Sequence, residues 1–579
     1  MTTQTWDETF DVVVVGSGAA GLAAAVTAAH NGLTAVVLEK ATQFGGTTAW
    51  SGGWLWIPRN PLATEAGIVE DKETVRTYLR AELGNRYDAA RVEAFLEAGP
   101  RMVDFFRRET ALEFRDGNAI PDMHGTLPGA GTGGRSVTAA PFDGRKLGAD
   151  LARLRPPKPE IAFLGMGIAS GADLGHFLAM TRSFASFRHV TGRFLRHLAD
   201  LALVGRGATL VNGNALAARL ARSALDRGVE IRTATPATAL IREGTRVVGV
   251  EAGGRRLRAV RGVVLAAGGF PADPVRRRAL FPHAPTGAEH WTAAPPENTG
   301  DGQRLGETAG AAFDATLAQP AAWAPVSLVP HQGRAPGHFP HLIERAKPGL
   351  IAVRADGRRF TNEADSYHDM IADLLAATPE STPATCWLIA DHRFVRRWGL
   401  GFAKPAPLPL APCLRSGYLK RGRTLAALAT ACGIDPAGLE ATVAAYNGPA
   451  RAGADPAFHR GGTPYNRVQG DGGACNAPIE HGPFYAVEIR PGSLGTFAGL
   501  ATDARARVLD TAGRAIPGLY AAGTDAASMM GGSYPAGGIN LGPAMAFGFI
   551  AARDLAGLPP LAPDENGKEP ACSTTSSQP

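Results

Sequence analysis

A glycine-rich turn near the start of the chain has the spacing that binds phosphate. Gly16, Gly18 and Gly21 form the pattern G-x-G-x-x-G. In this pattern the first glycine makes a tight turn, the second lets a pyrophosphate approach the backbone, and the third lets helix and strand pack closely. Glu39 follows roughly 20 residues further on, where a carboxylate can accept hydrogen bonds from a ribose. These residues predict a dinucleotide site.

The elements around this turn are those that would position it. Residues 10–15 (FDVVVV) form a short run rich in β-branched residues, which is typical of a strand buried on both faces. Residues 22–30 are alanine-rich and predict a helix, and residues 34–38 (TAVVL) predict a second strand that ends at Glu39. Together they form a βαβ unit, in which the N–H groups at the start of the helix face the phosphates.

Two further glycine-rich segments distinguish between possible dinucleotides. Residues 45–53 contain GGTT and SGG, and residues 518–525 (GLYAAGTD) read as a strand that ends in a second glycine turn. A bound NAD would not need three distant segments of this kind. FAD is longer and is often held by elements from both ends of a chain, so we expect one non-covalently bound FAD.

These segments, in this order, resemble the fumarate reductase/succinate dehydrogenase flavoprotein superfamily over roughly residues 8–557. The resemblance implies an α/β fold with a Rossmann-like FAD-binding domain and an inserted α+β catalytic (cap) domain. We expect the FAD-binding domain at residues 1–275 and 481–560, the inserted domain at residues 276–480, and a disordered tail at residues 561–579.

The resemblance also implies which residues hold the cofactor. Glu39 would bind the adenosine ribose, residues 47–53 would line the pyrophosphate and flavin, and Asp525 would reach the ribityl or phosphate region. The full implied set is Gly16, Gly18, Ala19, Ala20, Gly21, Glu39, Lys40, Gly46, Thr47, Thr48, Ser51, Gly52, Gly53, Ala237, Ala267, Gly268, Gly523, Asp525, Gly538, Ile539 and Leu541.

One segment separates the branches of this superfamily. Residues 357–370 read GRRFTNEADSYHDM, and the start of this stretch is shared across the superfamily. Fumarate reductases follow it with an arginine that protonates the substrate, whereas this chain has no arginine between residues 360 and 370. Residues 495–499 (GTFAG) also lack the histidine of the fumarate-type segment. A fumarate reductase-like ene-reductase is therefore disfavoured and stays as an alternative.

The tyrosine in this segment resembles the base of the 3-ketosteroid dehydrogenase branch. By that resemblance Tyr367 removes an α-proton. Residues 532–538 (GSYPAGG) match the branch's second signature, in which Tyr534 and the Gly538 N–H would hold a ketone oxygen as an oxyanion device. The implied reaction is α,β-desaturation of a 3-ketosteroid or a similar cyclic ketone, with hydride transfer to flavin N5. A smaller oxocyclohexane substrate remains an alternative.

The chain departs from that branch at a second tyrosine. The expected Pro-Asp-Tyr segment reads Pro-Asp-Met-His here, so Met123 stands where an assisting tyrosine would be. An unassisted tyrosinate costs roughly 4 kcal/mol at neutral pH, because tyrosine ionises about three pH units higher. His124 and His368 are the candidates to relay the proton instead.

Net charge, the lack of long apolar windows and cysteine spacing argue against several other classes of protein. The net charge of +6 comes without a dense basic run, which argues against nucleic-acid binding, and no window suits a membrane span. Five scattered cysteines without CxxC spacing argue against a zinc site or a disulfide framework and favour the cytoplasm. We expect no bound metal, a hydrophobic cyclic ketone as substrate and a quinone-like external electron acceptor. A non-catalytic flavin electron-transfer or binding module is the alternative.

Overall fold

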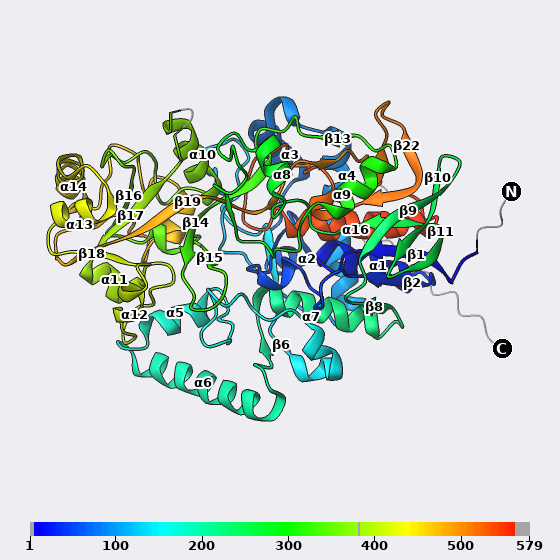
Figure 1. Ribbon diagram of the computed structural model, residues 1–579, viewed down its shortest axis with the longest axis horizontal. Helices are drawn as coiled ribbons and strands as arrows, with labels where there is room; N and C mark the ends of the chain where they lie inside the picture. The colour runs from blue at the N-terminus through cyan, green and yellow to red at the C-terminus, as the bar shows by residue number, and fades with distance from the viewer. Residues whose placement is uncertain (1–4, 380–381, 562–579) are drawn as a thin grey trace.

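The computed structural model describes residues 5–379 and 382–561. Two large sheets lie toward opposite ends of the molecule (Figure 1), one near the chain termini and the other formed by central and later segments. Cys572 and most of the expected tail, residues 562–579, lie outside the described residues. Across the described ranges, none of the helices combines the length and the apolar character needed to cross a membrane.

The first sheet contains the predicted βαβ unit. Its strands run in the order β21-β22-β11-β1-β2-β8, and β1 pairs in parallel with both β11 and β2. Val12 to Val15 are buried because helices cover the sheet. The strands are β1 (Glu8–Val15), β2 (Ala35–Leu38), β8 (Glu230–Arg232), β9 (Ala237–Glu243), β10 (Arg246–Ala252), β11 (Arg255–Leu265), β21 (Arg507–Leu509) and β22 (Ala515–Ala521).

Three helices from distant parts of the chain pack together on this sheet. The predicted helix is α1 (Ala19–His30), and it contacts α7 (Asn212–Leu225) and the C-terminal α16 (Leu541–Leu555). Glycine permits the closest of these approaches, because a Cβ on Gly548 would lie 2.4 Å from the Ala20 carbonyl oxygen. The helix that follows the glycine-rich turn and the last helix of the described chain, α16, therefore pack against each other (Figure 1).

The second sheet comes from chain that lies between β11 and β22 in the sequence. Its central strand is β19, which pairs with β12, β14, β17 and β18. Because β19 begins at Phe484, this sheet includes residues beyond the boundary expected at residue 480. The strands are β12 (Trp291–Thr292), β14 (Ala321–Val329), β15 (Gly337–Pro340), β16 (Leu350–Val353), β17 (Cys386–Asp391), β18 (Lys420–Gly422) and β19 (Phe484–Thr496).

The remaining elements join or cover the two sheets. A small sheet consists of β3 (Trp54–Trp56), β5 (Ser136–Ala139) and β4 (Phe114–Asp116). Two short pairs are β6 (Phe142–Asp143) with β7 (Thr209–Leu210) and β13 (Phe313–Asp314) with β20 (Gly499–Leu500). The other α-helices are α2 (Pro61–Glu65), α3 (Lys72–Leu83), α4 (Ala89–Glu109), α5 (Ala172–Ala179), α6 (Phe184–Val204), α8 (Pro274–Leu280), α9 (Asp301–Thr308), α10 (Tyr367–Ala377), α11 (His392–Trp398), α12 (Ala411–Arg415), α13 (Leu425–Cys432), α14 (Pro436–Ala450) and α15 (Pro464–Gln469).

Candidate active site

One cavity of about 1380 Å³ is lined by residues from both sheets and from the segments between them. It brings together most of the residues expected to hold the cofactor, along with Tyr367 and Tyr534. The predicted residues that line it are Gly16, Gly18, Ala19, Ala20, Glu39, Lys40, Gly46, Thr47, Thr48, Ser51, Gly52, Gly53, Ala237, Ala267, Gly268, Gly523, Gly538 and Leu541. Segments more than 500 residues apart in the sequence therefore share one site.

Three predicted cofactor residues, Gly21, Asp525 and Ile539, are not among the described residues that line this cavity. Gly21 is needed for packing, because a Cβ there would lie 2.0 Å from the Gly16 carbonyl oxygen. The assignment of Asp525 to the cofactor stays a prediction. Its buried carboxylate accepts hydrogen bonds from the N–H groups of Ala267 (2.5 Å) and Gly269 (3.0 Å), so it holds a turn that borders the cavity.

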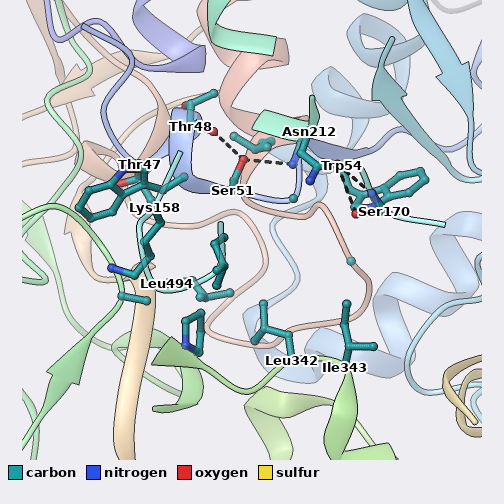
Figure 2. A pocket seen from close by; sticks show the side chains of 18 of the residues that line it. Thr47, Thr48, Ser51, Trp54, Lys158, Ser170, Asn212, Leu342, Ile343 and Leu494 are labelled. Atoms are coloured by element: carbon teal, nitrogen blue, oxygen red, sulfur yellow. Dashed lines mark hydrogen bonds between the residues drawn. The ribbon is translucent and has the colours of Figure 1, made fainter. Parts of the chain in front are cut away.

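The cofactor end of the cavity, formed by residues 16–20, 39–40 and 46–53, is built mainly from backbone. Gly18 caps α1 without a side-chain hydrogen bond, and a Cβ on it would meet only Thr48 Oγ1, at 3.5 Å. The start of α1 is therefore open to a phosphate. Thr48 Oγ1 accepts a hydrogen bond from the Ala19 N–H at 2.9 Å, and Figure 2 shows Thr47, Thr48 and Ser51 along this wall.

Two charged residues, Glu39 and Lys40, line the cofactor end of the cavity. The Glu39 carboxylate lines the cavity and already accepts hydrogen bonds from Ser17 Oγ (2.5 Å) and the Ala41 N–H (2.9 Å), which fix its position. Lys40 forms an ion pair with Asp301. The open helix start, the oriented carboxylate and the glycines together fit a bound dinucleotide.

The tyrosine end of the cavity is formed by Tyr367, Tyr465, Tyr534 and Gly538. The Tyr367 hydroxyl donates a hydrogen bond to the Tyr534 hydroxyl oxygen at 2.7 Å, and the two rings meet edge to face with centroids 5.0 Å apart. Asn540 Nδ2 also donates to the Tyr534 oxygen, at 3.4 Å. The two predicted tyrosines thus form one buried hydroxyl pair.

Only glycine fits at position 538. Its φ is +104°, and a Cβ there would lie 2.6 Å from the Trp56 backbone nitrogen. Its carbonyl oxygen accepts a hydrogen bond from the Trp56 N–H at 3.1 Å, whereas its own N–H has no partner within the described chain. A free backbone donor therefore lies at the wall of the cavity that Tyr534 also lines.

Burial makes ionisation of these tyrosines costly. Loss of solvent raises the pKa of Tyr367 well above 10 and raises the pKa of Tyr534 to about 12. Tyr465, which the sequence analysis missed, is buried against the same cavity, and burial raises its pKa to about 12. No motif marks Tyr465, because it lies about 100 residues from Tyr367 in the sequence and reaches it only through the fold.

One buried cation opposes this rise. The Arg345 Cζ lies 5.9 Å from the centroid of the Tyr367 ring, and its charge lowers the pKa of both Tyr367 and Tyr465. Arg345 is fully buried, and its Nη1 donates to the Glu363 carbonyl oxygen at 2.6 Å. Its Nε and Nη2 atoms have no hydrogen-bond partner among the described residues, although the charges of Asp365 and Glu344 act on the guanidinium.

The histidines proposed as relays do not contact Tyr367. Met123 lines the cavity as expected from the sequence, but His124 bridges Glu82 (2.7 Å) and Asp369 (2.6 Å). Although burial opposes protonation of His124, these two hydrogen bonds raise its pKa to about 10, so it is held as a cation in an ion-pair bridge. Both of its ring nitrogens are engaged, which contradicts the expected relay.

His368 is also engaged elsewhere. Its Nδ1 accepts a hydrogen bond from the Trp323 N–H at 3.1 Å, and burial lowers its pKa to about 4. The ring packs against Tyr534, with centroids 5.7 Å apart. A neutral imidazole with this hydrogen bond supports the wall behind Tyr534, and no hydrogen bond joins it to Tyr367 in the described chain.

Comparison with known proteins agrees with this geometry. The family model for the FAD binding domain matches residues 11–541. A 4-oxocyclohex-2-ene-1-carboxylate 5-dehydrogenase from Sinomonas cyclohexanicum is 41% identical, over 96% of this chain and 95% of the relative. A 3-oxosteroid 1-dehydrogenase from Mycolicibacterium smegmatis is 37% identical, over 94% of this chain and 97% of the relative.

A solved structure shows the same fold. The crystal structure of 3-ketosteroid delta1-dehydrogenase from Sterolibacterium denitrificans, in complex with 1,4-androstadiene-3,17-dione, superposes with a TM-score of 0.87 at 36% sequence identity. The match covers 95% of this chain and 100% of that one. The chain therefore belongs to the FAD-binding domain family, carries FAD as its cofactor, and is an FAD-dependent dehydrogenase related to the 3-oxosteroid dehydrogenases.

Proposed function

We propose that this protein introduces a C=C bond next to the carbonyl of a cyclic ketone. The observation that carries the proposal is the Tyr367–Tyr534 hydroxyl pair, which lines the same cavity as the cofactor end. The relatives support the substrate class, because they are named for an oxocyclohexene carboxylate and for 3-oxosteroids. Bound FAD would supply the hydride acceptor, held by Glu39 and the glycine-rich turn.

The protein's own groups would hold the ketone and move its proton. The Tyr534 hydroxyl and the free Gly538 N–H are two donors on one wall, so they can bind the carbonyl oxygen and stabilise the enolate. Tyr367 would act as the phenolate, after its own proton has passed to solvent, and the phenolate oxygen would accept the α-proton. The Tyr534 hydroxyl, which accepts a hydrogen bond from Tyr367 in this structure, keeps its own proton available to donate to the substrate oxygen.

Arg345 would replace the missing assisting tyrosine. A positive charge within about 6 Å typically favours the ionised form of an acid by one to three pKa units. The Arg345 Cζ lies 5.9 Å from the centroid of the Tyr367 ring, and its charge lowers the pKa of Tyr367. Tyr465 lines the same cavity but acts in the opposite direction, because its charge raises the pKa of Tyr367.

We propose that the second sheet and its helices form a cap, inserted in the sequence, that closes over the substrate. Phe339 and Trp398 from this region line the cavity, whereas Trp323 and Trp387 are buried in its core. An external acceptor of the quinone class would then reoxidise the protein. The four cysteines in the described chain are free thiols, which supports a reducing, cytoplasmic setting.

Anaerobic mixing of the purified holoprotein with a panel of ketones tests this proposal. We expect cyclic ketones to bleach the flavin absorbance, and the products to contain a new C=C bond next to the carbonyl. A panel in which fumarate oxidises the reduced protein, while no cyclic ketone reduces it, would instead favour the ene-reductase alternative. A protein that responds to neither would be an electron-transfer or binding module.

A further inference from the structure

Two buried ammonium groups lie beside Glu160 at a wall of the cavity. Lys158 and Lys404 both line the cavity. Lys158 Nζ lies 3.7 Å from Glu160 Oε2, and the two side chains are only 6% and 7% exposed. Lys404 Nζ donates to the backbone carbonyl oxygen of Glu160 at 3.3 Å. His331 Nε2 occupies the other carboxylate oxygen, at 3.0 Å.

This cluster has more positive than negative charge. Lys404 forms no ion pair with a carboxylate in the described chain, and its ammonium lies near the rings of Phe339 (5.3 Å) and Phe402 (5.8 Å). Burial lowers the pKa of Lys158 and of Lys404. Two lysines against Glu160 leave one excess cation at an apolar wall.

The other charged groups nearby leave Lys404 without a carboxylate partner at hydrogen-bonding distance in the described chain. The cavity-lining Glu344 carboxylate acts on Lys404 through its charge, and it contacts His341 at 2.6 Å. Arg155 pairs with Glu297 at 3.0 Å. The cofactor's phosphates would lie at the start of α1 on the first sheet, whereas Lys404 follows α11 in the second sheet region. Because a buried charge is stabilised by a counter-ion in direct contact, a ligand anion could pair with Lys404.

We propose that Lys404, with Lys158 beside it, binds a carboxylate on the substrate. This inference rests on the proposed function and narrows it: the substrate class would be a cyclic ketone that carries a carboxylate. The ketone oxygen would lie at Tyr534 and Gly538 and the carboxylate at Lys404. The apolar wall between them, which includes Leu342 and Ile343 (Figure 2), would contact the ring.

Binding of unreactive ligands to the holoprotein tests the site without turnover. Cyclohexanecarboxylate and cyclohexanecarboxamide have the same ring and differ in charge. We expect the wild type to bind the acid at least tenfold more tightly, measured by calorimetry or by perturbation of the flavin spectrum. Lys404→Met should remove this preference, and Lys404→Arg should keep most of it. Lys146→Met, an exposed site, controls for the loss of one positive charge.

Turnover gives a second readout. With 4-oxocyclohexanecarboxylate, Lys404→Met should raise KM at least tenfold and change kcat by less than threefold, whereas values for 4-methylcyclohexanone should not change. Equal binding of acid and amide by the wild type, or a loss of FAD from Lys404→Met, would overturn the inference. If the acid binds through Lys404 but no ketone reduces the flavin, the proposed function fails and the anion site stands.

Discussion

The two ends of the cavity are built in different ways. The cofactor end uses backbone groups and glycines that follow one another in a short segment, and steric limits fix their identity. The tyrosine end uses the side chains of Tyr367, Tyr465 and Tyr534, which lie on separate elements. Burial and the charge of Arg345 beside Tyr367 set their ionisation. Substitutions should therefore abolish function at the cofactor end where space is lacking, and should change rates and pH dependence by degrees at the tyrosine end.

The largest expected effect is at the cofactor end. Gly16 has φ +111°, and a Cβ there would lie 2.1 Å from the Ala266 carbonyl oxygen, which is backbone and cannot move away cheaply. We expect Gly16→Ala to purify with less than a tenth of the wild-type FAD, measured from its visible spectrum. Gly537→Ala is the matched control, because Gly537 lines the same cavity, has no positive φ and would have no atom within 4 Å of its Cβ. Equal FAD in the two variants would contradict the steric argument.

The next effect concerns the oxyanion donor at the tyrosine end. Tyr534→Phe should lower the rate of anaerobic flavin reduction by a ketone about 10²–10³-fold, the usual loss for one such donor. The flavin spectrum should not change. Tyr446→Phe removes another buried hydroxyl, one without a hydrogen-bond partner in the described chain, and should leave the rate as it is. A Tyr534→Phe rate within threefold of the wild type would show that the carbonyl is held elsewhere.

A charge effect should be smaller and visible as a shift in pH. Arg345 lowers the pKa of Tyr367, so its removal should raise that pKa and move the ascending limb of the reduction rate to higher pH by about one to three units. At pH 7 Arg345→Met should then be at least about tenfold slower, and Arg345→Lys should be intermediate. Arg206→Met, at another largely buried arginine, should not move the limb. An unshifted limb in Arg345→Met would exclude this role. Tyr465→Phe should move the limb the other way, to lower pH, because Tyr465 raises the pKa of Tyr367.

The smallest expected effect, on the Kd for FAD, concerns a single side chain at the cofactor end, that of Thr48. Thr48→Val removes the acceptor for the Ala19 N–H and should cost about 1 kcal/mol, or roughly a fivefold increase in the Kd for FAD. Thr48→Ser keeps the oxygen and should bind FAD like the wild type. Loss of all FAD in Thr48→Val would mean that side chains matter more at this end than the glycines suggest.

Local patterns predicted the cofactor end well. The strand at residues 10–15 and the helix that follows it were placed from periodicity and glycine spacing, and both lie within β1 and α1. Where a strand pairs with segments that are distant in the sequence, local patterns predicted less. No sequence pattern predicted a strand at residues 136–139, which form β5 because β3 and β4 lie on either side of them in space.

The tyrosine end shows the same limit at the level of single residues. Tyr367, Tyr534 and Gly538 were identified through family motifs, but Tyr465 and Arg345 have no motif and reach the site only through the fold. The histidine relay was wrong because groups on distant elements engage those rings. Asp525 shows a related effect, since two N–H groups from a distant segment donate to its carboxylate and no sequence motif marks that contact.

The central claim is that Tyr367 removes the α-proton of a cyclic ketone, and stopped-flow flavin reduction without oxygen tests it most directly. The account predicts that Tyr367→Phe binds FAD normally but reduces it at least 10²-fold more slowly than the wild type, the lower bound for loss of a general base. It also predicts that an α-deuterated ketone slows the wild-type reaction. A Tyr367→Phe rate within tenfold of the wild type, with the same isotope effect, would contradict the assignment of Tyr367 as the base.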